Sequence, residues 1–110
     1  MKDGCPFCDY SGPSEVIADW SDVIVFEPLH PVTRGHLLVV PKRHVARFHD
    51  DPLVSARVAE VAAREVDWRE GSYNVIVSTG APATQTVEHL HFHLVPRREG
   101  DGLLLPWSER

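Results

Sequence analysis

The sequence predicts an α+β domain built from an antiparallel sheet of about five strands and one main helix. Short apolar runs rich in β-branched residues recur along the chain, and turn-forming residues separate them, as is typical of strands. One longer stretch, residues 52–66, repeats apolar residues at roughly the 3.6-residue period of a helix. The order is therefore hairpin, strand, helix, strand and strand, which favours an antiparallel sheet with a single helix.

Two strands predicted near the amino terminus are close enough in sequence to form a hairpin. Residues 14–18 form a short strand, residues 19–22 a turn, and the apolar run at residues 23–26 a second strand. Pro28 and Pro31 follow. Each lacks the N–H that a sheet ladder needs, so we expect the pairing to end there.

The central strand and the helix come next. Residues 36–40 are almost continuously apolar and stop at Pro41, which indicates a strand covered on both faces. Asp50-Asp51-Pro52 is a helix start, with an aspartate N-cap and proline at the first helical position. The helix is predicted over residues 52–66, with charged residues on its outer side and a connector at 66–71.

The second half of the chain adds two strands and a tail. Residues 73–78 form a strand, residues 79–84 a loop, and residues 87–95 the last strand. The tail, residues 97–110, is polar at first but apolar at residues 103–107. We expect these apolar residues to dock on their own domain or on a second subunit.

Composition places the chain among ordinary globular proteins. Its 110 residues suffice for one domain, 1–110, with a core of its own. The formal net charge of −5 argues against binding a nucleic-acid polymer through its backbone, but not against a small nucleotide. The amino terminus does not resemble a signal peptide, and no apolar run approaches the length of a membrane span. We therefore expect a cytoplasmic protein with no membrane partner.

Three histidines alternate with apolar residues in the last predicted strand. In a strand the apolar set faces a core and the histidines share the other face; the two sets are Leu90, Phe92, Leu94 and His89, His91, His93. Protonated imidazoles so close together would repel each other, so the patch stays mostly neutral, holds an anion or holds a metal. Two functionless alternatives are a purification tag, which this internal and interrupted pattern disfavours, and a row of surface histidines.

Cysteine occurs only at Cys5 and Cys8, in the sequence Cys-Pro-Phe-Cys. Three interpretations stand: a zinc half-site, a redox dithiol, or two thiols with no special role. A thioredoxin-type redox pair follows a strand and opens a helix, whereas this pair precedes a predicted loop. Zinc needs two further ligands, and the chain has seven histidines that could supply them.

Two segments resemble the signatures of one protein family. His-Leu-His-Phe-His-Leu-Val at residues 89–95 resembles the histidine triad motif, with a similar lead-in at residues 85–87 and a similar exit at Pro96-Arg97. Gly-His-Leu-Leu-Val-Val-Pro-Lys-Arg-His at residues 35–44 resembles a second, independent signature of the same family. The resemblance implies a half-barrel α+β fold, commonly paired into a homodimer, and a nucleotide hydrolase or transferase.

The resemblance also implies a role for each matching residue. His91 attacks the α-phosphorus of a nucleotide and forms a nucleotidyl-histidine intermediate, which water hydrolyses. The substrate is a nucleoside phosphoramidate, a dinucleoside polyphosphate or a related nucleotide conjugate. The other phosphate contacts fall on His36, Gln85, Thr86 and His93, with Thr86 and Gln85 offering hydroxyl and amide donors.

In part of this family, zinc is held by an amino-terminal Cys-x-x-Cys, a histidine of the Pro-Lys-x-His segment and the first triad histidine. The matching residues here are Cys5, Cys8, His44 and His89. The resemblance therefore implies a structural zinc ion and makes residues 1–12 a zinc-binding segment.

The chain departs from the family pattern at the sugar-binding position and in the glycine loop. Many members hold the ribose with an aspartate two residues after the equivalent of Phe26, where this chain has Pro28; Glu27 is the neighbouring acid. Ser78 stands where asparagine is common, and Thr84 where glycine is frequent.

Two other functions fit the same motifs. One is a non-catalytic nucleotide-binding protein, and the other is a zinc-stabilised scaffold or interaction module. His91 distinguishes the enzyme from both, because neither zinc binding nor the fold needs that side chain.

Overall fold

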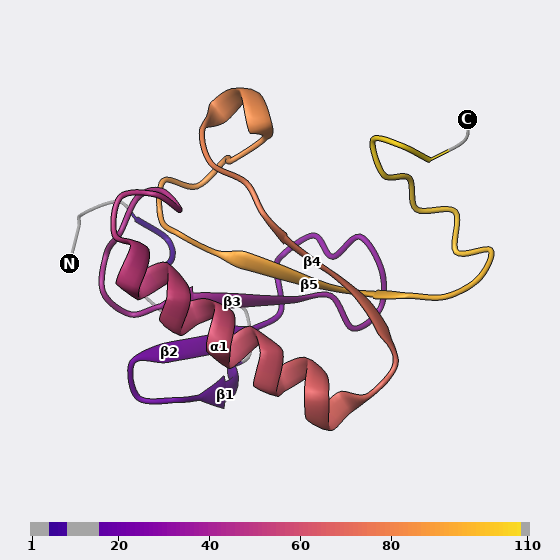
Figure 1. Ribbon diagram of the computed structural model, residues 1–110, viewed down its shortest axis with the longest axis horizontal. Coiled ribbons are helices and arrows are strands. Elements are labelled where there is room, and N and C mark those ends of the chain that lie inside the picture. Colours follow the sequence, from indigo (N-terminus) through magenta and orange to yellow (C-terminus); the bar gives the residue numbers. More distant parts are fainter. Residues whose placement is uncertain (1–4, 9–15, 109–110) are drawn as a thin grey trace.

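The computed structural model describes residues 5–8 and 16–108. Five strands form one open antiparallel sheet in the order β1-β2-β3-β5-β4, as Figure 1 shows. The elements are β1 (Val16–Asp19), β2 (Val23–Phe26), β3 (Leu37–Pro41), α1 (Pro52–Arg69), β4 (Ser72–Val77) and β5 (Phe92–Arg97), with a 3₁₀ turn at Ala81–Ala83. The predicted fold class is confirmed; the first two residues of the strand predicted at 14–18 lie outside the described residues.

Helix α1 begins and ends at residues whose chemistry suits those positions. Asp51 is the N-cap, and its carboxylate accepts a hydrogen bond from the Val54 N–H at 3.3 Å. The helix runs three residues beyond the predicted end, to Arg69, whose guanidinium pairs with the buried carboxylate of Glu65 one turn earlier. It stops where Glu70 takes a φ of 60° and Gly71 a φ of 97°.

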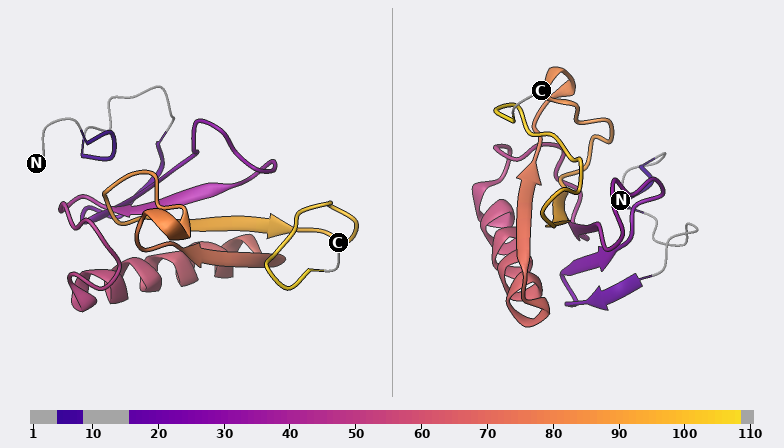
Figure 2. Two further views of the ribbon diagram at one scale, coloured as in Figure 1. Left: turned by 90° about the horizontal axis from the view of Figure 1, so that it is seen from above. Right: turned by 90° about the vertical axis from the view of Figure 1, so that its right-hand side faces the viewer.

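The sheet has an apolar core on each face. Figure 2 shows α1 lying along one face, and there α1 packs against alternate strand residues, namely Val23, Val25, Leu37, Val39, Phe92 and Leu94. The intervening residues form a smaller cluster on the opposite face: Ile24, Phe26, Leu38 and Val40, with Phe7 packed against them. Strands β2 and β3 are thus buried on both sides, as the apolar character of residues 36–40 predicted for β3.

The last strand begins later than predicted. Residues 87–95 were expected to form it, but β5 starts at Phe92 and continues to Arg97. Before that point the backbone N–H of Leu90 bonds to the carbonyl of Val45, beyond the end of β3, at 2.6 Å. The predicted alternation still holds, because Leu90, Phe92 and Leu94 all lie in the main core. His89 and His91 therefore precede the sheet ladder.

The carboxyl-terminal segment lies against its own domain. Leu103, Leu104 and Leu105 line a cavity together with residues of β4 and β5, which agrees with the first of the two docking sites expected for the tail. Within the described part of the chain, no helix is long and apolar enough to cross a membrane.

Candidate active site and metal centre

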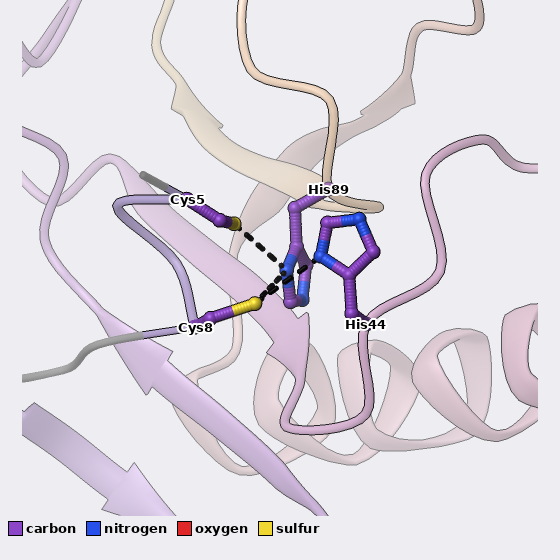
Figure 3. Close-up of side chains that lie close together, drawn as sticks. All are labelled: Cys5, Cys8, His44 and His89. Carbon is purple, nitrogen blue, oxygen red and sulfur yellow. Dashed lines mark hydrogen bonds between the residues drawn. The ribbon is translucent and has the colours of Figure 1, made fainter. Parts of the chain in front are cut away.

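The triad histidines divide between two adjacent clusters. His89 is fully buried and lies with Cys5, Cys8 and His44, as the close-up in Figure 3 shows. His93 instead bonds to His36, at the start of β3. His91 lies between the two clusters in sequence, and its ring packs against that of His93 with 5.1 Å between ring centroids. The alternating pattern therefore serves two different sites.

The Cys/His cluster brings together ligands from three distant segments. One ligand atom from each of Cys5, Cys8, His44 and His89 lies within 4.8 Å of all the others. The Sγ–Nδ1 separations are 3.3 Å for Cys5–His89, 3.2 Å for Cys8–His44 and 3.4 Å for Cys8–His89. A tetrahedral zinc ion with ordinary bond lengths places such atoms about 3.5 Å apart, so the cluster fits zinc.

Hydrogen bonding and burial also leave His89 neutral, with a lone pair free to bind a cation. The Nε2–H of His89 donates to the carbonyl of Pro41 at 2.7 Å, which leaves the Nδ1 lone pair facing the sulfur atoms. Burial lowers the pKa of His89 to about 4, so the ring is neutral at pH 7. Burial raises the pKa of Cys5, and a bound cation would supply the charge that stabilises its thiolate.

His91 has its tautomer set by its own backbone. Its Nδ1 lies 2.8 Å from the carbonyl oxygen of His89. Because a carbonyl only accepts hydrogen bonds, Nδ1 carries the proton and Nε2 keeps a lone pair. The side chain is 7% exposed, and burial lowers its pKa. His91 is thus a neutral imidazole with a nucleophilic nitrogen at pH 7.

A chain of hydrogen bonds sets the tautomers of His36 and His93. The Val32 N–H donates to His36 Nδ1 at 3.1 Å, so the proton of the His36 ring is on Nε2. That Nε2–H donates to His93 Nδ1 at 3.0 Å, which puts the proton of His93 on its Nε2. Burial, with smaller contributions from His91 and His36, lowers the pKa of His93 to about 4. His93 therefore presents an N–H donor from a ring that packs against the ring of His91.

We expect His93 to make stability fall on acidification. Its folded pKa of about 4 lies below the ordinary 6.5, so between these values the unfolded chain binds more protons. The contribution of His93 to the free energy of unfolding is complete above pH 6.5 and is lost as the pH falls toward 4. Between pH 7 and pH 5 the loss is roughly 2 kcal/mol. Urea unfolding at both pH values measures this loss. The His93→Gln variant should lose less unfolding free energy between the two pH values. Equal losses in the variant and the wild-type protein would contradict the lowered pKa of His93.

Phe7, between the two cysteines, is a site residue that the sequence did not single out. Its ring centroid lies 5.1 Å from that of His91 and 5.5 Å from that of Phe26, both in edge-on geometry. Phe7 therefore connects the metal-binding segment to the histidine that carries the free lone pair. Its position between two candidate metal-ligand cysteines was the available signal, because cysteines held on either side of Phe7 restrict where the ring can lie.

Comparison with known proteins identifies the family. The HIT domain model matches residues 11–100. The chain belongs to the histidine triad family. An uncharacterised HIT-like protein of Methanocaldococcus jannaschii is 36% identical, over 96% of this chain and 88% of the relative. Adenosine 5'-monophosphoramidase HNT1 of Saccharomyces cerevisiae is 35% identical, over 94% of this chain and 69% of the relative.

A solved structure in the family bears on the metal. A zinc-bound histidine triad family protein from Mycobacterium smegmatis is 36% identical and superposes with a TM-score of 0.77, covering 92% of this chain and 80% of that chain. The family that the segments at residues 35–44 and 89–95 predicted is thus confirmed.

The role implied for Gln85, a contact between its amide and substrate oxygens, stays a prediction. In the structure the Gln85 side chain is buried and bonds to the loop. Its Nε2 donates to the carbonyls of Ala46 at 2.6 Å and Val87 at 3.0 Å, and its Oε1 accepts from the Gly80 N–H at 2.8 Å. With both amide hydrogens engaged, Gln85 holds the segment before the histidines in place.

The remaining predicted substrate contacts lie in different environments. Thr86 is exposed, three residues after the end of the 3₁₀ turn. Glu27 is exposed just after β2, whereas the Phe26 ring is buried on the face opposite α1. Thr84 adopts a left-handed conformation with φ 70° and ψ 24°, which explains why glycine suits this position in the family.

Proposed function

We propose that this protein is a histidine triad hydrolase that cleaves nucleotide conjugates at the α-phosphate, with a nucleoside phosphoramidate as the favoured substrate class. The observation that carries the proposal is the His91 tautomer: Nδ1–H is held by the His89 carbonyl, and Nε2 has a lone pair. A nucleophile for phosphorus needs such a lone pair at neutral pH. The phosphoramidase activity of the yeast relative supports the choice of substrate.

The reaction proceeds in two displacements. The lone pair of His91 Nε2 attacks phosphorus, the bond from phosphorus to the leaving nitrogen breaks, and the amine departs with a proton taken from water. Water then attacks the nucleotidyl-histidine, the bond from phosphorus to Nε2 breaks, and the water's proton passes to solvent. The sum is conjugate plus water giving nucleoside monophosphate plus amine. Throughout, the His91 Nδ1–H and the His89 carbonyl stabilise the charged imidazole of the intermediate.

Neighbouring groups assist by holding oxygens of the substrate. The Nε2–H of His93, oriented by His36, is the donor for a non-bridging phosphate oxygen. Thr86, exposed at the start of the histidine segment, offers a hydroxyl to the same phosphate. We propose that Phe26 and Glu27 contact the nucleoside of the substrate. Phe26 would do so as part of the aromatic cluster that it forms with Phe7.

Zinc is proposed as a structural ion held by Cys5, Cys8, His44 and His89, a donor set typical of closed structural sites. When bound, it would tie residues 5–8 to the histidine segment and keep His89 neutral; the rest of the proposed zinc-binding segment 1–12 lies outside the described residues. The free thiols in the described residues suit a reducing compartment, in support of a cytoplasmic protein. We also propose a single domain over residues 1–110 and a homodimer, since β4 is an edge strand with Val75 and Ile76 exposed.

Turnover of adenosine 5'-phosphoramidate by the zinc-loaded protein tests the proposal. We expect release of AMP and ammonia, measured by chromatography, and a transient nucleotidyl-histidine signal in samples quenched with alkali. If diadenosine polyphosphates are cleaved and phosphoramidates are not, the hydrolase stands with a different substrate class. Binding of AMP without turnover of any conjugate would favour a non-catalytic nucleotide-binding protein instead.

A further inference from the structure

The two cysteines lie close enough to each other to form a disulfide. Residues 5–8 form a turn in which the Cys8 N–H donates to the Cys5 carbonyl at 3.2 Å. Such turns bring the first and fourth Cα atoms within about 7 Å, and disulfides join Cα atoms about 4.4–6.8 Å apart. The two Sγ atoms lie within 4.8 Å of each other. A Cys5–Cys8 disulfide therefore needs side-chain rotation and little movement of the backbone.

The two thiols differ in their access to solvent. Cys5 is half-buried and Pro6 beside it is exposed, whereas Cys8 is 4% exposed. A dissolved oxidant therefore reaches Cys5 first, and Cys8 is the resolving thiol behind it. Figure 3 shows both cysteine side chains pointing toward the rings of His44 and His89. An accessible cysteine beside a resolving thiol is typical of reversible oxidation sites.

A disulfide would remove half of the metal donors without disturbing the rest of the fold. Two of the four donors are the sulfurs, and the remaining pair, His44 and His89, does not make a closed tetrahedral zinc site. His89 keeps its place without the metal, because its Nε2–H donates to the Pro41 carbonyl at 2.7 Å. The core under α1 contains none of the four ligands. Oxidation would therefore release zinc and change only the region around the cysteines.

Phe7 connects this chemistry to the active site. It lies between the two cysteines in the turn, and its ring contacts that of His91, which is only 7% exposed. Metal ligation on both sides of Phe7 would hold the ring there. After oxidation, packing against Phe26 is what remains to hold it. An aromatic contact of this kind shifts a conformational equilibrium about twofold to tenfold, so its loss is measurable.

We propose that Cys5 and Cys8 form a reversible oxidation site for hydroperoxides, and that its oxidation releases zinc and uncovers His91. The Cys5 sulfur attacks the peroxide, the O–O bond breaks, and a sulfenic acid and an alcohol form. The Cys8 sulfur then attacks the Cys5 sulfur, the S–O bond breaks, and water leaves. Two thiols and a hydroperoxide thus give a disulfide, an alcohol and water. A dithiol reductant reverses the change by exchange.

Titration of the zinc-loaded protein with hydrogen peroxide tests the thiol chemistry. We expect zinc and disulfide to appear in equal amounts, measured with a chromogenic chelator, a thiol reagent and the mass loss of two hydrogens. Treatment with dithiothreitol, its removal and addition of zinc should restore both thiols and the full zinc content. Zinc retained with both thiols free under excess peroxide would overturn the proposal. Thiol loss that dithiothreitol does not reverse would overturn it as well.

Cys5→Asp is the matched variant, because a carboxylate can bind zinc but cannot form a disulfide. Since Cys8 is buried, the variant should keep its zinc at the peroxide dose that empties the wild-type protein. Release of zinc from the variant at that dose would overturn the disulfide as the cause. If the variant binds no zinc, the wild-type titration decides alone.

Labelling of histidines with diethyl pyrocarbonate, assigned by tandem mass spectrometry, tests the effect on His91. Oxidation should raise the labelling rate of His91 about twofold to tenfold and leave that of the exposed His49 unchanged. Phe7→Leu keeps both cysteines, so it should release zinc as the wild-type protein does, with little further change at His91. An unchanged His91 rate in the oxidised wild-type protein would overturn the link to the active site.

The inference uses the proposed zinc site but not the proposed hydrolase activity. Zinc release, thiol content and histidine labelling are all measured without substrate. Failure to turn over any nucleotide conjugate would therefore overturn the proposed function and leave the oxidation site standing.

Discussion

Replacing His91 with alanine is expected to lower kcat for an adenosine phosphoramidate by at least about 10⁴-fold, in line with the loss of other enzymatic nucleophiles. The variant lacks the Nε2 lone pair that the His89 carbonyl makes available through Nδ1. Water would have to attack phosphorus directly, without a nitrogen nucleophile already in position. Rapid-quench chromatography of AMP measures the effect, and the nucleotidyl-histidine signal should disappear with it.

His49→Ala is the control for histidine loss, because His49 is exposed and lies outside both clusters. It should retain wild-type turnover. His91→Ala must also bind zinc in the wild-type proportion and fold normally, since Cys5, Cys8, His44 and His89 form the metal cluster. Turnover by His91→Ala within tenfold of wild type would rule out His91 as the nucleophile.

Replacing Cys8 with serine is expected to abolish stoichiometric zinc binding and to lower Tm by about 10 °C or more. Cys8 is 4% exposed, and its Sγ lies near Nδ1 of both His44 and His89. Without the metal, the hydrophobic core under α1 persists. The segment carrying Phe7 would lose its attachment to the smaller core on the other face. Atomic absorption and calorimetry measure the two effects.

Chelation of wild-type zinc should reproduce the Tm of Cys8→Ser, while the same chelator should leave the Tm of the variant unchanged. His49→Ala again serves as control, and it should keep full zinc content. If Cys8→Ser bound zinc stoichiometrically and melted at the wild-type temperature, the four residues would not form a metal site. If the wild-type protein contained no zinc and Cys8→Ser still had a lower Tm, the destabilisation would come from core packing at Cys8.

Most of the fold follows from local sequence. The β-branched apolar runs at residues 23–26 and 37–40 form strands in any context that covers both faces, and Asp51 with Pro52 starts a helix by local hydrogen bonding and fixed φ. At the start of the last strand, where the prediction failed, a partner distant in sequence decided the outcome. The β5 ladder begins at Phe92 because Leu90 bonds to Val45, which no local pattern encodes.

The sequence by itself determined the family and the fold class, and it proposed the residues of the site, because motif spacing and apolar alternation are local properties. Only the tertiary structure decided how those residues are shared: His89 with the cysteines, His93 with His36, and Gln85 with backbone carbonyls. The tertiary structure also decided the tautomer of His91 and formed the cavity that His93 lines. A tautomer is set by its hydrogen-bond partners and a cavity by the residues that line it, and both come from segments that meet only in the folded chain.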